Sequence, residues 1–304
     1  MRLAMVGLGR MGGNMARRLR RADIEVVGFN RSFGVTGALA RESGLIPAAS
    51  LGEAVAQLQA PRVVWSMVPA GAPTDQQIRD LIPLLEPGDI IVDGGNSNYR
   101  DSVQRGAMLR EHGLHFVDCG TSGGVWGLDN GYCLMLGGDE PALQVLRPVL
   151  EALAPAPDRG WAHVGPVGAG HYTKMVHNGI EYGMMQAMAE GFALLRAKQE
   201  FALDLGQIAE IWRHGSVVRS WLLDLTADVL ERDQALDEVA PTVADSGEGR
   251  WTAKEAIDLG VAAPVISLSL AMRFASQDRE EAYGNRLLAM MRNAFGGHAI
   301  EGRD

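Results

Sequence analysis

The chain has little cysteine, no long apolar run and no excess of basic residues. Two cysteines in 304 residues, Cys119 and Cys133, cannot form a disulfide framework, which favours a reducing, cytoplasmic location. A net charge of −9 argues against a general nucleic-acid binder, which would carry a basic stripe. Neither a membrane span of ~18 apolar residues nor the apolar core of a signal peptide is present. The composition therefore predicts a soluble protein that binds neither nucleic acid nor membrane.

Glycine, by contrast, is abundant: the chain has 38, of which 26 lie in residues 1–170. Residues 1–166 alternate short apolar runs with helical stretches, which predicts a doubly wound, parallel Rossmann-type sheet with helices on both faces. Residues 167–304 predict an all-α substrate and dimerisation domain that ends in a C-terminal tail. Its expected helices cover residues 168–198, 205–213, 221–231, 253–259 and 263–275.

The first glycine cluster has the pattern of a dinucleotide-binding loop. Gly7-Leu8-Gly9-Arg10-Met11-Gly12 fits G-x-G-x-x-G, directly after an apolar run and before a helical stretch over residues 14–21. In such a loop the glycines allow a tight turn, close approach of a pyrophosphate and close packing of helix on strand. The alternative is a glycine turn in an α/β domain that binds no nucleotide.

The end of the second expected strand bears on which cofactor is used. It reads Phe29-Asn30-Arg31-Ser32 and has no acidic residue to hold a ribose 2′-hydroxyl, while Arg31 could accommodate a 2′-phosphate. This pattern favours NADP. If Arg31 only stacks on the adenine, NAD remains open.

The long helix expected over residues 168–198 carries an unusual set of polar side chains. At offsets of 0, 3, 4, 7 and 8 residues, one helix face would hold Lys174, His177, Asn178, Glu181 and Tyr182. A solvated face with one Lys–Glu pair is the alternative, and such a pair stabilises little. A face with one each of five functional groups is more typical of an active-site wall, with Lys as a base and Glu as a proton donor. Apolar surroundings are expected from Met175, Val176, Ile180, Met184 and Met185.

Two loops add weaker signals. Asp93-Gly94-Gly95-Asn96-Ser97 follows an apolar run, where α/β sheets place ligand contacts, and Ser122-Gly123-Gly124 exposes backbone. Each could equally be a simple turn. The seven histidines are scattered without metal-ligand spacing, so no metal site is predicted.

Together these motifs resemble the 6-phosphogluconate dehydrogenase family of the β-hydroxyacid dehydrogenase superfamily, over nearly the whole chain. The most specific matches are residues 92–97, 122–124 and 174–182. The resemblance implies metal-independent oxidative decarboxylation of 6-phosphogluconate to ribulose 5-phosphate and CO2, with Lys174 as base and Glu181 as acid. It implies substrate contacts from Asn96, Ser122, Gly123, Gly124, His177, Asn178, Tyr182, Arg250, Arg273, Arg292 and His298. It implies cofactor contacts from Gly7, Leu8, Gly9, Arg10, Met11, Gly12, Asn30, Arg31, Ser32, Val68, Pro69, Ala70 and Asn96.

The C-terminal part of the resemblance concerns assembly and cofactor choice. Arg292 to His298 resemble a tail that reaches into a neighbouring subunit, which implies a homodimer or homotetramer with a shared active site. The chain passes almost directly from Ala275 to Tyr283, where long forms of the family carry further helices. It therefore resembles the short form, which often prefers NAD, against the inference from Arg31.

Two other functions fit parts of the sequence. A non-decarboxylating β-hydroxyacid dehydrogenase, of the 3-hydroxyisobutyrate type, would share the cofactor loop and Lys174 but would not need a cluster of cations for a phosphate. A non-catalytic dinucleotide sensor would keep the glycine loop but would have no reason to keep Lys174 together with Glu181.

Overall fold

The computed structural model describes residues 1–276 and 282–300. The chain forms two compact units, Met1–Lys174 and Met175–Asp304. The division falls inside helix α8, Ala169–Ala197. Within the described residues, no helix is both long and apolar enough to cross a membrane.

Unit 1 is built on one eight-stranded sheet in the order β3-β2-β1-β4-β5-β6-β7-β8. The first five strands along the chain are β1 (Arg2–Val6), β2 (Glu25–Phe29), β3 (Ile46–Pro47), β4 (Val63–Ser66) and β5 (Ile90–Asp93). The last three are β6 (His115–Ser122), β7 (Cys133–Gly138) and β8 (Trp161–Gly165). The fold class predicted from the sequence is thus confirmed for this unit.

One strand pair differs from the expected parallel sheet, because β6 and β7 pair antiparallel. Their connection holds only a short 3-10 turn, Gly124–Trp126, and the four-residue helix α6 (Gly127–Asn130). A parallel pair needs a crossover of a dozen or more residues, so this short connection returns the chain in the opposite direction. The next strand, β8, again runs parallel to its neighbour β7.

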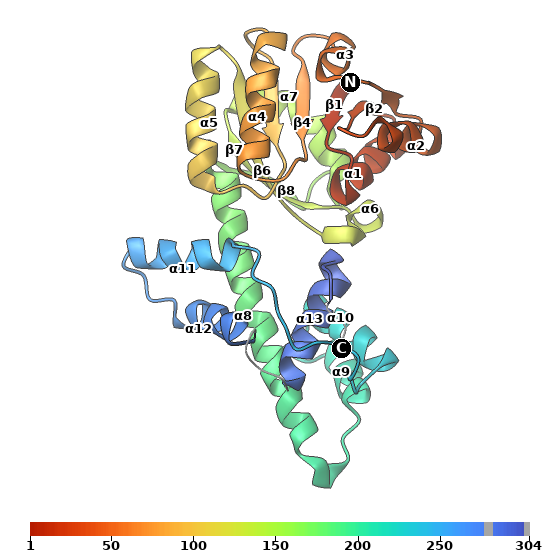
Figure 1. Cartoon of the computed structure of the whole chain (residues 1–304), viewed down its shortest axis with the longest axis vertical. Coiled ribbons are helices and arrows are strands. Elements are labelled where there is room, and N and C mark those ends of the chain that lie inside the picture. The colour runs from red at the N-terminus through yellow and green to blue at the C-terminus, as the bar shows by residue number, and fades with distance from the viewer. Residues whose placement is uncertain (277–281, 301–304) are drawn as a thin grey trace. The chain divides into compact units, whose positions relative to one another are not determined.

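Helices cover both faces of the sheet because successive strand residues point to opposite sides (Figure 1). Leu3 and Met5 pack in one core, with α1 (Arg10–Arg21), α2 (Phe33–Ser43) and α7 (Glu140–Leu153). Ala4 and Val6 pack in the other, with α3 (Leu51–Ala56), α4 (Ala72–Leu81) and α5 (Tyr99–Glu111). The helices cover the faces of the sheet, so the loops that carry the predicted motifs lie at the carboxyl ends of the parallel strands.

Unit 2 is helical. Besides the rest of α8 it contains α9 (Leu205–Arg213), α10 (Trp221–Arg232), α11 (Glu248–Asp258), α12 (Pro264–Ala275) and α13 (Tyr283–Gly296). Its core joins α8 to α10 and α13 through buried residues such as Phe192, Leu230 and Leu287.

The helix expected over residues 253–259 begins five residues earlier, at Glu248. Two glycines lie at the start of this helix. Gly247, at φ +102°, starts the helix, and Gly249 lies inside it. A Cβ on Gly249 would lie 2.3 Å from the Tyr182 ring, so the glycine allows α11 to approach α8. The helix over residues 14–21 likewise begins earlier, at Arg10.

Candidate active site

The glycine loop between β1 and α1 has the geometry of a phosphate cradle. Gly7 adopts φ +90°, and a Cβ there would lie 2.7 Å from the Met67 carbonyl oxygen. A Cβ on Gly12 would lie 2.0 Å from the Gly7 oxygen, so this position also requires glycine. A Cβ on Gly9, in contrast, would meet no described atom within 4 Å. The loop is therefore tight on the protein side and open where a pyrophosphate would approach.

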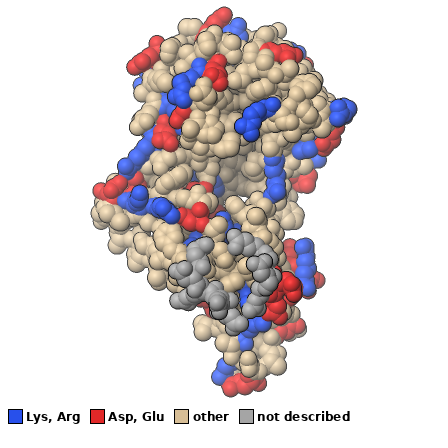
Figure 2. Space-filling model, viewed as in Figure 1, with Lys and Arg blue, Asp and Glu red and all other residues tan. Residues whose placement is uncertain are grey.

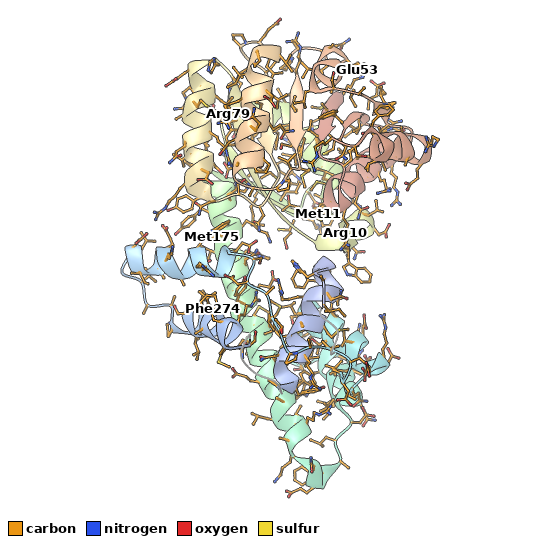
Figure 3. The ribbon with its side chains drawn as sticks, in the orientation of Figure 1. Arg10, Met11, Glu53, Arg79, Met175 and Phe274 are labelled. Carbon is orange, nitrogen blue, oxygen red and sulfur yellow. The ribbon has the colours of Figure 1, made fainter. Side chains whose placement is uncertain are left out.

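The start of α1 supports the same ligand. The first turn, with Arg10 and Met11 labelled in Figure 3, contains no acidic residue. Gly9 is its N-cap and offers no side chain to satisfy the first N–H groups. These N–H groups and the positive end of the helix dipole suit an anion, so the residues fit the dinucleotide that the sequence predicts.

The three residues after β2 differ in what they contact. The Asn30 side-chain oxygen accepts a hydrogen bond from the Leu8 backbone N–H at 3.1 Å, which ties the β2 end to the glycine loop. Arg31 is exposed, and Ser32 is the N-cap residue of α2. Arg31 is thus the one cation among these three residues, and it is exposed.

Asn96 lies in a loop that buried charges hold in place at the end of β5. Asp93 is 1% exposed and accepts hydrogen bonds from the Ser97 hydroxyl at 2.8 Å and from the Arg105 guanidinium at 3.2 Å. Arg105 also donates to Asp75 on α4 at 2.8 Å. The loop bearing Asn96 is thus fastened to two neighbouring helices.

The turn at Val68, Pro69 and Ala70 follows β4, the adjacent strand. The Thr74 hydroxyl donates to the Pro69 carbonyl oxygen at 2.9 Å. A Cβ on Gly95 would lie 2.9 Å from the Val68 oxygen, so the loops after β4 and β5 touch. The two predicted contact segments therefore lie together at one edge of the sheet.

The glycines at the end of β6 are required by the backbone. Gly123 and Gly124 have φ +128° and +54°, where other residues are strained. Arg18 of α1 donates to the Leu128 carbonyl oxygen at 3.1 Å and to the Ala154 carbonyl oxygen at 2.7 Å, which holds the segment after Ser122-Gly123-Gly124 against α1.

Helix α8 places Lys174 and Glu181 two turns apart on one face. Lys174 is 8% exposed, and the side chain of Glu181 is 17% exposed. His177 Nδ1 lies 3.0 Å from Asn178 Oδ1 and 3.8 Å from a Glu181 carboxylate oxygen. Burial raises the pKa of the Cys133 thiol and nearby Lys174 opposes the rise, so this thiol lies within electrostatic range of Lys174.

The expected apolar surroundings hold only in part. Met175 and Met185 are buried, whereas Ile180 is 54% and Met184 39% exposed. At about 100° per residue, Ile180 lies about 120° around the helix from Lys174, and Met184 lies about 80° from it, on the same side as His177. These two residues therefore border the polar face on one side but are exposed instead of packed around it.

Unit 2 brings several predicted cations together around Tyr182. The Arg273 guanidinium carbon lies 3.2 Å from the centre of the Tyr182 ring. Arg273 and Arg292 are 2% and 6% exposed. Burial, and to a smaller extent the charge of Arg292, lower the pKa of Arg273 to about 10, while Tyr182 and Glu181 oppose the change. Both guanidiniums are therefore buried in one chain and close enough for their charges to interact.

The Arg273 side chain is not fully hydrogen-bonded within the described residues. Among residues 1–276 and 282–300, Arg273 Nη2 is buried and has no hydrogen-bond partner. Its Nη1 donates only a long bond, 3.5 Å, to the Ala244 oxygen. A buried unpaired donor on a cation is costly, so the arrangement fits an anionic ligand.

The other two predicted cations lie differently. Arg250 pairs with Asp245 at 3.0 Å, and its guanidinium lies 5.2 Å from the centre of the Phe274 ring, labelled in Figure 3. Asp245 also accepts a hydrogen bond from the Tyr182 hydroxyl at 3.1 Å. It thus connects Arg250 to Tyr182, the ring on which Arg273 lies. His298 packs against Phe295, with ring centres 5.7 Å apart.

The comparisons with known proteins decide the family. Residues 2–165 match the model for the NAD binding domain of 6-phosphogluconate dehydrogenase, and residues 170–302 match the model for its C-terminal domain. The chain belongs to the 6-phosphogluconate dehydrogenase family. It is an oxidoreductase with a nicotinamide dinucleotide-binding domain.

Relatives within the 6-phosphogluconate dehydrogenase family differ in their named cofactor. The chain is 42% identical to an NAD-dependent, decarboxylating 6-phosphogluconate dehydrogenase of Haloferax volcanii, over 100% of both chains. It is 37% identical to an NADP-dependent, decarboxylating enzyme of Bacillus subtilis, over 92% of this chain and 62% of that protein.

Solved structures show the same fold. The Plasmodium falciparum 6-phosphogluconate dehydrogenase matches with a TM-score of 0.83 at 26% identity, over 97% of this chain and 71% of that one. A Mycobacterium tuberculosis 3-hydroxyisobutyrate dehydrogenase matches with a TM-score of 0.74 at 24% identity, over 96% and 99%, which reflects the common fold.

Several residues that shape this family's site were missed from the sequence. Arg18, Arg105 and Asp118 carry charges that read as surface groups, and only the fold shows what they hold. Across the described part of the chain, no group of three or more His, Cys, Asp and Glu side chains is arranged to hold a metal ion.

Proposed function

We propose that the protein oxidatively decarboxylates 6-phosphogluconate to ribulose 5-phosphate and CO2 and reduces NAD or NADP. The buried pair of Arg273 and Arg292, with the unpartnered donor on Arg273, carries this proposal because a guanidinium fork matches a phosphate and two cations suit its double charge. On the face seen in Figure 2, basic and acidic side chains are interspersed, so the charge of an anionic substrate must be met locally. The arginine pair is such a local site for a sugar phosphate, and the glycine loop is one for a dinucleotide.

The residues of helix α8 supply the proton transfers. Neutral Lys174 takes the proton of the C3 hydroxyl of the substrate. A nicotinamide dinucleotide held by the glycine loop would supply the acceptor for the hydride that leaves C3. The resulting β-keto acid loses CO2 because its ketone accepts the electron pair of the broken bond, and protonated Lys174 stabilises the developing negative charge. Glu181 then protonates the enediol carbon. Since the Lys174 ammonium supplies the electrophilic charge, this scheme needs no metal.

The alternative activity, that of a non-decarboxylating 3-hydroxyisobutyrate-type dehydrogenase, differs in its substrate. A 3-hydroxyisobutyrate-type substrate has no phosphate and gives no reason to bury two guanidiniums. Release of CO2 from 6-phosphogluconate, measured together with dinucleotide reduction, tests the proposal directly. Reduction without CO2 would support the alternative, and binding of dinucleotide without any turnover would support a sensor.

The cofactor preference is expected to depend on Arg31. We expect Arg31→Ala to raise KM for NADP about tenfold, since it removes one exposed charge-assisted contact, and to leave KM for NAD within about twofold. Steady-state assays with both dinucleotides, side by side, measure this. Arg41→Ala, at an exposed position later in α2, is the matched control. Equal changes for both dinucleotides would contradict a role for Arg31 at the 2′-phosphate.

We also propose a cytoplasmic homo-oligomer, a dimer or tetramer, formed through a flank of unit 2. Ile180 and Met184 on α8 and Val265 and Leu268 on α12 are 39–65% exposed. The two helices are neighbours, since a Cβ on Gly183 would lie 3.2 Å from Val265 Cγ1. Such an apolar surface is typical of an interface.

Leu268→Glu is expected to weaken this association, because it places a charge in the apolar flank. Light scattering across a concentration series measures the shift toward monomer. Val103→Glu, at a 49% exposed position on α5, is the control that should leave assembly unchanged. Wild-type assembly of Leu268→Glu would contradict this interface.

A further inference from the structure

The start of helix α8 is held by a buried carboxylate that no motif reveals. Asp118 on β6 is 0% exposed and accepts the backbone N–H of Gly168 at 2.6 Å and that of His171 at 2.8 Å. The His171 side chain is also buried, and its Nδ1 lies 2.7 Å from the Ser102 hydroxyl on α5. The turn that leads into Lys174 is therefore fastened to the sheet and to a neighbouring helix.

Glycines seat the same turn directly on the sheet. A Cβ on Gly170 would lie 2.4 Å from the Asp118 carbonyl oxygen, and one on Gly120 would lie 2.4 Å from Lys174 Cβ. Asp118 and Gly120 are two residues apart on β6, so their side-chain positions share one face of the sheet. The Asp118 carboxylate and the Cβ atom of Lys174 thus lie over the same short stretch of strand.

We propose that Asp118 is a positioning residue, which fixes the height and rotation of α8 and so the place of the Lys174 amine. This inference rests on the proposed catalytic role of Lys174. Capping a helix does not require a buried aspartate on another element. Other helices of the chain are capped by the residue that precedes them, which accepts one N–H each: Ser50, Asn98 and Ser220. Asp118 instead holds two N–H groups from a second element.

The charge of Asp118 comes at a cost in stability. Burial raises the pKa of its carboxyl, while nearby His171 and the backbone N–H groups lower it. A carboxylate kept where burial disfavours its charge is more readily explained by the geometry it holds than by stability.

The test is Asp118→Asn in the full-length protein. The amide keeps the shape but presents an NH2 group to one of the two N–H donors, so the helix start should loosen. We expect kcat for 6-phosphogluconate to fall about 100-fold, as for a misplaced catalytic group, while both KM values stay within about twofold. Hydrogen exchange of the amides in residues 168–174 should become faster. Asp204→Asn, which alters an exposed carboxylate cap on α9, should change neither measurement.

The outcomes separate this proposal from the proposed function. Faster exchange with unchanged kcat, or unchanged exchange, overturns the positioning role. If Asp118→Asn does not fold, Gly120→Ala takes its place, since the added methyl must displace Lys174 Cβ, and an unchanged kcat there also overturns it. A wild-type chain that does not turn over 6-phosphogluconate overturns the proposed function, and exchange then still decides whether Asp118 anchors α8.

Discussion

Replacement of Lys174 by methionine is expected to abolish turnover of 6-phosphogluconate. The substitution keeps the length and apolar stem of a side chain that is 8% exposed, so the fold and the glycine loop should persist. It removes the amine that serves as base and then as the cation beside the developing negative charge. General base catalysis contributes about 10²- to 10⁴-fold, and electrostatic stabilisation of such charge a further ~10²- to 10³-fold. We therefore expect kcat to fall at least about 10⁴-fold.

Single-turnover absorbance of the reduced dinucleotide measures the loss, and equilibrium titration shows whether dinucleotide binding is kept. Lys198→Met is the matched control: this residue follows the end of α8, and its side chain is 52% exposed. Its kcat should equal that of the wild type. Turnover by Lys174→Met within tenfold of the wild type, as a rough threshold for loss of a base, would remove Lys174 from the mechanism.

Arg273→Met is expected to raise KM for 6-phosphogluconate about 100-fold or more. Loss of one partner from a buried, charged hydrogen-bonded pair costs about 2–5 kcal/mol, and each 1.4 kcal/mol corresponds to about tenfold in affinity. Arg273 is 2% exposed and its charge interacts with that of Arg292, so its loss removes a buried partner for a phosphate. KM for the dinucleotide should not change, because that ligand is assigned to unit 1.

The same variant should not be less stable without substrate. The pKa of Arg273 is lowered from its ordinary value to about 10, mainly by burial, and this shift corresponds to about 3 kcal/mol against the charged form. Below pH 10 the group is charged both folded and unfolded, so the full cost is present at neutral pH and is relieved only as pH rises through the folded-state pKa.

Thermal unfolding with and without 6-phosphogluconate tests both expectations. The substrate should raise the Tm of the wild type but not that of Arg273→Met, and the variant without ligand should melt no lower than the wild type. Arg232→Met, at the exposed end of α10, is the control that should behave as the wild type. An equal rise in Tm for both proteins would place the phosphate elsewhere.

The local parts of this fold could be read from the sequence because they depend on neighbouring residues. The glycine loop needs only a turn between a strand and a helix, and the structure has both at β1 and α1. Helix α8 was predicted over residues 168–198 and covers Ala169–Ala197, since i to i+4 hydrogen bonds form within one segment. The row of functional groups on α8 follows from that helix alone.

Parts that depend on distant segments could not be read in this way. The start of α11 at Glu248 depends on Tyr182, whose ring occupies the place that a side chain at Gly249 would fill. The buried roles of Arg105 and Asp118 depend on strands and helices far along the chain. A charged residue in an amphipathic helix or a strand reads as solvent-exposed until its partners are known.

By itself, the sequence determined the alternation of strands and helices in the first domain, the dinucleotide loop and the polar face of α8, because each is set by side-chain periodicity and backbone bonds within a few residues. It did not reveal the short strands β3 and β8, or that residues read as a C-terminal tail form helix α13. The tertiary structure alone decided that β7 reverses direction, that Arg273 and Arg292 are buried together, and that Asp118 holds the start of α8. These features arise from packing and burial, where the environment of a charge is set by residues as far as 136 positions away in the chain, as for Arg18 and Ala154.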